Sequence, residues 1–266
     1  MLQDQSPQQI KIDPIKFIEG TFKLRGKTIK LYDYQKKILE DPYPFVVINK
    51  SRQTGISTVI AMDALTNCMF KENFLHLVIS RNEITTREII GYCYDLLYSM
   101  PEPLVKFYVL KTESKTEFQF ANGSRLICLA NSSGAGRGFA ANAVDLDEFA
   151  FVNEAEKDRD KQILSSVGPA ISRGGKLRII STPFGKQGEY WRIWSNPTNF
   201  STHKINWKEC PELVASGKDF LITSLPEPKE IYWAQEYENQ FVESITGFIP
   251  VEWYDVAVNK SLRGFI

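Results

Sequence analysis

The chain has 266 residues, of which 43% are hydrophobic, so it is long enough for one α/β domain with a subdomain, or two small domains, and too apolar to be disordered. Lys and Arg together number 32, as do Asp and Glu, so net charge gives no general attraction to nucleic acid or a membrane. The four scattered Cys, the polar N-terminus and the lack of any apolar run near ~18 residues argue against zinc sites, a disulfide framework, a signal peptide and a membrane span.

Apolar stretches in the first half of the chain alternate between strand-like and helix-like patterns. Residues 1–30 are polar and then mixed, and they suggest an N-terminal arm or a β-edge. The pattern then predicts a short helix over residues 34–40 and a buried strand over residues 45–49. A small-residue loop follows, with a helix after it over residues 57–71. A second strand is expected over residues 75–79 and an amphipathic helix over residues 83–99.

The second half of the chain continues this alternation. The dipeptide Asn122-Gly123 between two alternating runs predicts a β-hairpin over residues 117–130. Further strands are expected over residues 143–146, 177–181 and 202–207, with helices from about residue 153 and over residues 188–195. From Lys208 onward, Pro-bearing turns and an amphipathic helix over residues 228–243 indicate a smaller, mostly helical lid. Alternating strands and helices predict a mainly parallel sheet with helices on both faces.

Residues 44–58, PFVVINKSRQTGIST, have the form of a loop that binds nucleotide phosphate. Gly55 lets the backbone approach a phosphate closely, and Ser57 stands where a Mg²⁺-binding hydroxyl is needed. The segment departs from the usual pattern GxxxxGK[ST] in two places. Lys50 takes the position of the first Gly, and Ile56 takes that of the Lys.

Two cations at the start of the loop can compensate for the missing lysine. Lys50 or Arg52 could fold back over the phosphates, Lys50 as a point charge and Arg52 as a two-oxygen clamp. Taken alone, the loop is equally compatible with a Gly-bearing turn that caps a helix through Ser57 or Thr58, and each cation with a solvated loop residue.

Adjacent carboxylates, Asp147 and Glu148, end the apolar strand after the hairpin. In an open parallel sheet this strand end and the phosphate loop meet at one edge, where Asp147 would hold Mg²⁺ and Glu148 would polarise the attacking water. Asp145 lies deeper on the same face and is expected to be hydrogen-bonded or salt-bridged within the fold. His76 and His203 are expected to be packed or surface residues rather than ligands.

Three further polar features are compatible with either a functional role or an ordinary structural one. Arg137, in a glycine-rich loop, could act as an arginine finger or be an ordinary exposed residue. Ser181-Thr182-Pro183 could sense the γ-phosphate or form a Pro-containing turn. Gln35 could pair with an adenine edge or lie on a helix surface.

Taken in order, these segments resemble the ATPase domain of large terminase subunits, the DNA-packaging motors of tailed bacteriophages. The resemblance covers most of the chain, residues 31–246. The segments that carry it are LYDYQ (31–35), SRQTGIST (51–58), the hairpin FQFANGSRLICLA (118–130), GRGF (136–139), VDLDEFAF (144–151) and STPFG (181–185).

The resemblance implies a P-loop NTPase fold of the ASCE/RecA-like type with a small helical lid, and a role for each matched residue. Gln35 would read adenine, Glu148 would be the catalytic glutamate, and Arg137 would reach as a finger into a neighbouring subunit. Ser57 and Asp147 would hold the metal. The phosphate loop would be formed by Ser51, Arg52, Gln53, Thr54, Gly55, Ile56, Ser57 and Thr58, with Arg52 or Lys50 as its cation. The coupling motif would be Ser181, Thr182 and Pro183.

The resemblance also implies an organisation and partners. We expect an N-terminal arm (1–30), an ATPase core (31–207) and a lid with the start of a linker (208–266), with no C-terminal nuclease domain and no nuclease activity. The cofactors would be ATP and Mg²⁺. The partners would be double-stranded DNA, a portal protein and a small terminase subunit, with a pentameric ring of this chain on the procapsid, a monomer in isolation, no membrane, and the host-cell cytoplasm as location.

Two alternatives remain open at this level. A non-catalytic DNA- or portal-binding module with a degraded nucleotide site would explain Ile56, and a helicase-like translocase would need a second RecA-like lobe. For DNA contact, the basic clusters at residues 23–30 and 173–178 are candidates, although solvated faces are the simpler reading.

Overall fold

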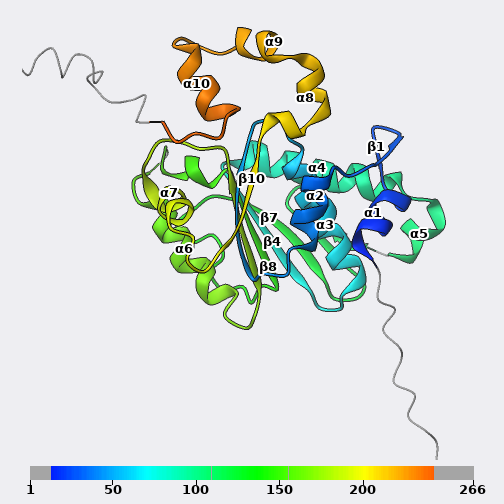
Figure 1. The fold of residues 1–266 in the computed structure, drawn as a ribbon. Coiled ribbons are helices and arrows are strands. Elements are labelled where there is room, and N and C mark those ends of the chain that lie inside the picture. The colour runs from blue at the N-terminus through cyan, green and yellow to red at the C-terminus, as the bar shows by residue number, and fades with distance from the viewer. Residues whose placement is uncertain (1–12, 109, 155, 243–266) are drawn as a thin grey trace, which may run out of the picture.

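An eight-stranded β-sheet runs through the centre of the protein (Figure 1). The computed structural model describes residues 13–108, 110–154 and 156–242. The strands stand in the order β10-β3-β9-β8-β4-β7-β6-β5, parallel from β10 to β7 and antiparallel at β6 and β5. Their bounds are β3 (Phe45–Lys50), β4 (Leu75–Ser80), β5 (Leu110–Glu113), β6 (Glu117–Phe120), β7 (Arg125–Ala130), β8 (Ala143–Asp147), β9 (Lys176–Ser181) and β10 (Ser201–Ile205).

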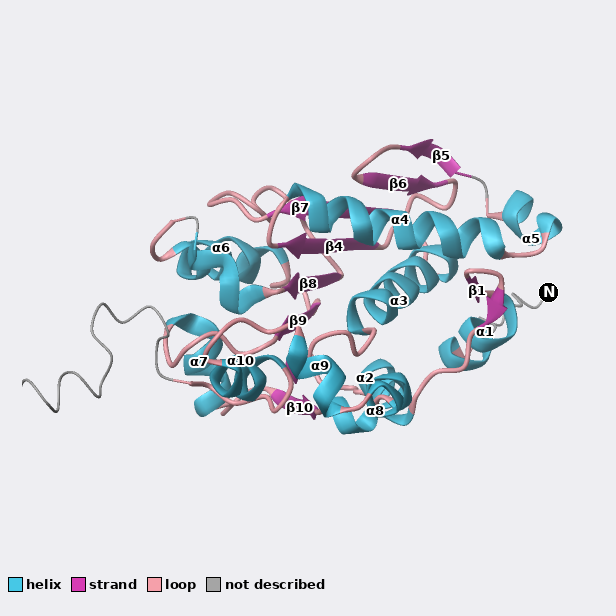
Figure 2. Cartoon of the chain, turned by 90° about the horizontal axis from the view of Figure 1, so that it is seen from above, coloured by secondary structure: helices cyan, strands magenta, loops and turns pink. Residues whose placement is uncertain are grey.

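Helices cover both faces of this sheet, which explains why its central strands are apolar on both sides. In β3, Val46 and Ile48 face the cluster formed with α1 (Pro14–Thr21), α2 (Asp33–Glu40), α3 (Ile56–Phe70) and α4 (Glu83–Ser99). Val47 faces the opposite cluster, formed with α6 (Arg159–Ala170) and α7 (Gly188–Ser195). Figure 2 shows α3 and α4 on one side of the sheet and α6 on the other. The predicted α/β fold with a mainly parallel sheet is confirmed.

Several predicted elements coincide with those in the structure. The helices α4 and α7 have the predicted bounds, and the Asn122-Gly123 hairpin is formed by β6 and β7, which pair antiparallel. The strands at the phosphate loop and at the carboxylate pair are present as β3 and β8, each one residue longer than predicted.

The N-terminal region differs from the expected arm or β-edge. Asp13 caps α1 by accepting hydrogen bonds from the backbone of the helix's first turn, and Pro14 occupies its first position. Ile18 and Phe22 are buried in the core beside α3. The short strands β1 (Lys23–Leu24) and β2 (Lys27–Thr28) pair only with each other. Residues 1–12 of the predicted arm lie outside the described residues.

Three other predictions shift. The helix expected from residue 153 is a 3₁₀ turn, η1 (Phe149–Glu154), followed later by α6. The last strand stops at Ile205, because Trp207 turns into the lid within η2 (Trp207–Glu209) and packs there. The helix expected over residues 228–243 is α10 (Lys229–Glu236), and residue 243 lies outside the described residues.

The lid is a helical unit above the carboxyl ends of the parallel strands (Figure 1). It contains α8 (Pro211–Ser216), α9 (Lys218–Thr223) and α10. Its core is its own, made by Trp207, Cys210, Leu213, Leu221, Trp233 and Tyr237. The helical character of the lid is as predicted, while the domain boundaries stay predictions. Among the described residues, no helix has both the length and the apolar character needed to cross a membrane.

Candidate nucleotide-binding site

The phosphate loop connects β3 to α3 at the carboxyl edge of the sheet. Gln53 and Gly55 both have left-handed backbone conformations, with φ of 58° and 73°. Thr54 braces the turn by donating its hydroxyl hydrogen to the Ser51 carbonyl at 3.0 Å. Because Gly55 directly precedes α3, the unpaired N–H groups of that helix's first turn open toward the loop. Such a helix N-terminus attracts anions.

Gln35 supports this loop from behind. Its Nε2 donates to the Thr54 carbonyl at 3.3 Å, and Tyr34 donates its hydroxyl to the same carbonyl at 2.8 Å. The Gln35 Oε1 atom accepts the Tyr32 N–H at 3.0 Å. A Cβ added at Gly55 would lie 3.1 Å from Gln35 Nε2, so the loop and this amide are closely packed. Gln35 is therefore a buried loop support here, and its adenine-reading role stays a prediction.

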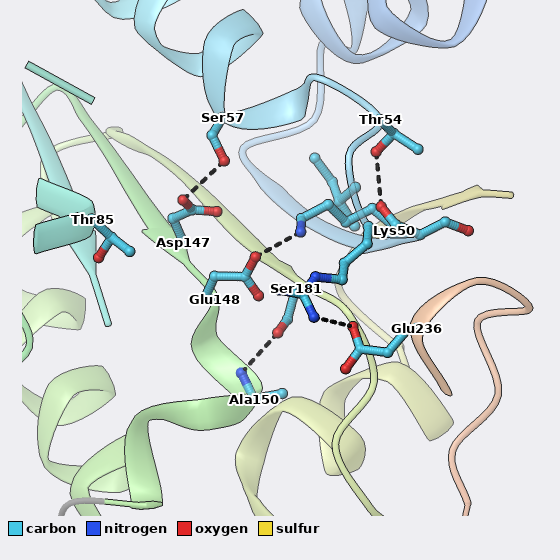
Figure 3. Close-up of polar contacts among 12 residues, drawn as sticks. Lys50, Thr54, Ser57, Thr85, Asp147, Glu148, Ala150, Ser181 and Glu236 are labelled. Carbon is cyan, nitrogen blue, oxygen red and sulfur yellow. Dashed lines mark hydrogen bonds and ion pairs between the residues drawn. The ribbon is translucent and has the colours of Figure 1, made fainter. Parts of the chain in front are cut away.

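Asp147 lies beside the start of α3. Ser57 donates its hydroxyl to Asp147 Oδ2 at 3.1 Å, whereas Asp147 Oδ1 is buried with no hydrogen-bond partner among the described residues (Figure 3). Burial, and then the neighbouring Glu148, raise the pKa of Asp147 to about 7. An unsatisfied carboxylate oxygen next to a hydroxyl fits one side of a Mg²⁺ site, because this ion takes few protein ligands and completes its shell with phosphate and water.

Lys50 and Glu148 form an ion pair at the centre of the site. Lys50 Nζ lies 2.7 Å from Glu148 Oε1, and the Lys50 side chain is buried (Figure 3). Burial alone would lower the pKa of Lys50, but the charges of Glu148 and Asp147 outweigh it and raise that pKa. Glu148 itself has a φ of 54°, a conformation that is uncommon outside glycine and frequent at functional sites.

Arg52, the second candidate cation, points toward the lid. Its guanidinium lies 3.8 Å from Glu236 at the end of α10, and its side chain is 61% exposed. The residue that replaces the usual lysine, Ile56, is fully buried in the cluster between α3 and the sheet. Its side chain therefore belongs to the hydrophobic core rather than to the surface of the loop.

The expected coupling segment contacts the segment that follows Asp147 and Glu148. The buried Ser181 Oγ accepts the Ala150 N–H at 3.2 Å (Figure 3). In the sheet, Ser181 pairs with Asn49. The Tyr190 hydroxyl donates a hydrogen bond to the Ser181 carbonyl at 3.0 Å. Thr182 is also buried. The Ser181–Ala150 hydrogen bond links the segment after Glu148 to the end of β9.

Arg137 lies apart from this cluster. It is exposed on a turn in which its N–H donates to the Gly134 carbonyl at 3.0 Å. Within the described chain no ion pair joins its guanidinium to Glu148 or to any other carboxylate. The structure thus leaves its guanidinium exposed, and its role as a finger stays a prediction.

A buried charge network lies deeper in the sheet. Arg178 Nε lies 2.5 Å from Asp145, its Nη2 atom lies 2.7 Å from Asp63 on α3, and His76 Nε2 lies 2.7 Å from Asp145. Burial would raise the pKa of Asp145, but Arg178 and His76 outweigh it and hold that pKa low. The expectation of a salt-bridged Asp145 and a packed His76 is confirmed. Arg178, however, is removed from the basic cluster at residues 173–178, since a buried arginine cannot face DNA or solvent.

Residues that reach the loop from the lid carry no recognisable sequence signal. Tyr237 and Asn239 lie 186 and 188 residues after Ser51, with which they form hydrogen bonds, and Glu236 precedes them. No spacing rule connects positions so far apart, so only the fold reveals these contacts.

Comparison with known proteins agrees with this geometry. A family model described as "Terminase large subunit, T4likevirus-type, N-terminal" matches residues 47–255. The large terminase ATPase domain of Thermus phage P74-26 is 17% identical, with a TM-score of 0.66 over 87% of this chain and 98% of that chain. The large terminase of bacteriophage HK97 is 16% identical, with a TM-score of 0.70 over 91% of this chain and 57% of that chain.

A large terminase from a thermophilic bacteriophage, solved in complex with ADP, is 13% identical, with a TM-score of 0.59 over 80% of this chain and 54% of that chain. At these identities the likeness shows the fold, which is the terminase ATPase-domain form of the P-loop fold. The chain spans just over half the length of the HK97 protein and of this ADP-bound protein. The family resemblance seen in the motifs is confirmed.

Proposed function

This chain belongs to the T4likevirus-type terminase large-subunit family, and we propose that it is the ATP-hydrolysing motor domain that drives double-stranded DNA into a viral procapsid. The observation that carries the proposal is the grouping at one sheet edge of an anion-binding loop, a hydroxyl–aspartate pair with an unsatisfied oxygen, and a lysine–glutamate pair. The large terminase of the thermophilic bacteriophage, solved with ADP and with ATP-γ-S, supports nucleotide as the ligand.

In this proposal the loop N–H groups and the N-terminus of α3 bind the phosphates. Ser57 and Asp147 would hold Mg²⁺, which when bound neutralises charge on the phosphates. Lys50 supplies the cation that Ile56 cannot, because it alone of the two candidates lies among the site's carboxylates. When a phosphate group replaces Glu148 as the partner of Lys50, Glu148 is free to orient the attacking water and to accept its proton.

Motion then passes outward through the neighbouring segments. Ser181, Thr182 and Pro183 couple phosphate loss to the lid, and Arg137 reaches a neighbouring subunit's phosphates in a ring, proposed to be a pentamer on the procapsid. Portal protein and small terminase subunit are the proposed protein partners, and the host cytoplasm the proposed location. The exposed cations on the β1–β2 ribbon, Lys23, Arg25 and Lys27, are candidates for contact with DNA phosphates.

The first test is nucleotide binding and turnover by this chain. Glu148→Gln should bind ATP with Mg²⁺ as the parent does and lose most hydrolysis, by about 10²-fold or more, because the amide cannot accept the proton from water. Calorimetry measures binding, and phosphate release measures turnover. Glu230→Gln, at an exposed position of α10, is the matched control and should behave as the parent.

Retained turnover in Glu148→Gln would remove Glu148 from the proposed role. A folded parent that binds no nucleotide would favour the alternative, a non-catalytic DNA- or portal-binding module. Nucleotide binding is measured first, because binding to a single copy of the chain does not require a ring.

A further inference from the structure

Two chain segments attach the lid to the core, and one side chain contacts both. The chain enters the lid at residues 205–207 and leaves it at residues 236–240. Asn239 lies in the second segment, shortly after α10 ends, with 4% of its surface exposed and a φ of 56°. Asparagine tolerates this left-handed conformation better than most residues, and its amide can donate and accept at once.

The Asn239 amide is fully used. Its Nδ2 lies 3.1 Å from the Ile205 carbonyl and 3.1 Å from Asn49 Oδ1, both of which accept from it. Its Oδ1 is 3.1 Å from the Ser51 hydroxyl and accepts from Asn206 Nδ2 at 3.3 Å. Asn49 in return donates from Nδ2 to the Asn239 carbonyl at 3.2 Å. One buried amide thus joins the ends of β3 and β10, the first loop residue and both lid segments.

Backbone hydrogen bonds reinforce this junction on either side. The Ser51 N–H donates to the Ile205 carbonyl at 2.8 Å, and the Arg52 N–H donates to the Glu236 carbonyl at 2.8 Å. The Ser51 hydroxyl also lies 2.5 Å from the Tyr237 carbonyl. The start of the phosphate loop is therefore held by the entry and exit of the lid, rather than by the sheet alone.

We propose that Asn239 is a positioning residue for nucleotide binding, which locks the start of the phosphate loop to the base of the lid so that the two move as one body. The effect on nucleotide binding rests on the proposed function, whereas the contacts that join the loop to the lid do not depend on it. Removing the amide takes from the buried Asn49 Oδ1 the donor that Asn239 supplies, and a buried acceptor left without its donor is costly in a folded protein. The loop and the lid base would then loosen together.

The test uses a substitution that keeps the backbone conformation. Asn239→Gly removes the amide, while glycine accepts the positive φ freely. Asn73→Gly is the matched control, because Asn73 also has a positive φ, of 51°, but lies exposed before the amino end of β4, whereas the phosphate loop follows the carboxyl end of β3. Two readouts are taken on the full chain: the dissociation constant of ATP with Mg²⁺ by calorimetry, and hydrogen exchange of the Ser51 and Arg52 amides without nucleotide.

Asn239→Gly should weaken ATP binding by about tenfold or more and speed exchange of both amides, in line with the loss of several buried hydrogen bonds. Asn73→Gly should change neither. Parent-like affinity with unchanged exchange in Asn239→Gly would overturn the proposal. Faster exchange with parent-like affinity would overturn the positioning role and leave only a structural one.

Two further situations are covered. If the parent binds no nucleotide, the proposed function fails, and the exchange readout alone decides whether Asn239 locks the loop to the lid. If Asn239→Gly does not fold, Asn206→Asp serves instead. Asp keeps the oxygen that accepts the Lys208 N–H at 3.1 Å, and it loses the Nδ2 that donates to Asn239 Oδ1 and to the Tyr237 carbonyl, both at the base of the lid. It should produce a smaller change of the same kind, and no change would overturn the proposal.

Discussion

Lys50 differs from Arg52 in its surroundings more than in its charge. Its ammonium is buried and lies 2.7 Å from Glu148, where a phosphate group would meet it, whereas Arg52 extends toward Glu236 and is mostly exposed. The Arg52–Glu236 pair has one mostly exposed partner and a separation of 3.8 Å, so it contributes little to stability. The cation that replaces the missing loop lysine is therefore expected to be Lys50.

Lys50→Ala should weaken ATP binding by about 10²-fold, while Arg52→Ala should weaken it by about tenfold or less, because only the first change removes a desolvated charge from the phosphate site. Calorimetric titration of both variants with ATP and Mg²⁺ provides the comparison. The reverse ranking would transfer the role to Arg52. Equal, parent-like affinities would mean that neither residue substitutes for the loop lysine.

Asp147 couples the site to pH through its raised pKa, which lies at about 7 in the folded chain. A carboxyl whose folded pKa exceeds its unfolded value, near ~4, favours the folded state most below the unfolded pKa. That contribution is lost as pH rises through the folded pKa, because the folded protein then releases a proton that the unfolded chain has already lost. Between about pH 4 and pH 7, Asp147 should therefore make the protein less stable as pH rises.

Asp147→Asn should flatten this dependence. The difference in free energy of unfolding between about pH 5 and about pH 8 should shrink by on the order of 1–3 kcal/mol relative to the parent. Urea unfolding at the two pH values measures it, and comparing variant with parent cancels the other titrating groups. A variant with the same pH dependence as the parent would show that Asp147 is not the group responsible.

At the scale of elements, the first turn of α3 performs two tasks. Its N–H groups face the loop, while Ile56 packs against the core on its inner side. Replacing Ile56 by the lysine of the usual phosphate-loop pattern would thus bury an ammonium without a partner. The loop thus accommodates an apolar residue at position 56, and its charge is expected to come from Lys50 at the end of β3.

Ile56→Lys should destabilise the protein by about 2–4 kcal/mol and should not improve ATP binding. Ile56→Val is the conservative control and should cost about 1 kcal/mol. Urea unfolding and ATP titration measure the two effects. Tighter binding at parent-like stability would show that the side chain at position 56 can reach the phosphates after all.

The same elements show what sequence patterns can predict. The bounds of α4 follow from its apolar spacing and from Asn82, which caps it by accepting the Thr85 N–H. The loop and the carboxylate pair carry local signatures, so their placement at one edge followed from parallel topology. In contrast, α1 was not predicted, although Asp13 and Pro14 form a helix-start signal at its N-terminus.

The contacts that complete the site lie beyond such local patterns. The hydrogen bonds of Ser51 with Tyr237 and Asn239 arise from packing between residues far apart in sequence. The end of α10 and the choice between Lys50 and Arg52 likewise depend on tertiary surroundings rather than on composition. Local sequence patterns thus located the candidate site residues, whereas the residues that hold them in place could be identified only from the folded structure.

At the scale of the whole molecule, the proposed motor depends on Arg137, which lies outside the candidate site of its own chain. Arg137 is exposed on the loop after β7, and within the described residues its side chain has no ion-pair partner. Of its two flanking glycines, Gly136 packs against Val167 of α6, whereas Gly138 faces open space. If Arg137 completes a neighbour's site, binding and turnover should respond to it differently.

Arg137→Ala should bind ATP with the affinity of the parent and yet lose about 10³-fold of any hydrolysis that rises with protein concentration. Phosphate release measured over a wide range of protein concentrations separates this shared activity from that of single copies. Arg173→Ala, at an exposed turn before β9, is the matched control and should retain the concentration dependence. If Arg137→Ala hydrolyses as the parent does when concentrated, the cation that acts between subunits lies elsewhere on the chain. A loss of ATP binding in the isolated copy would instead place Arg137 in its own site.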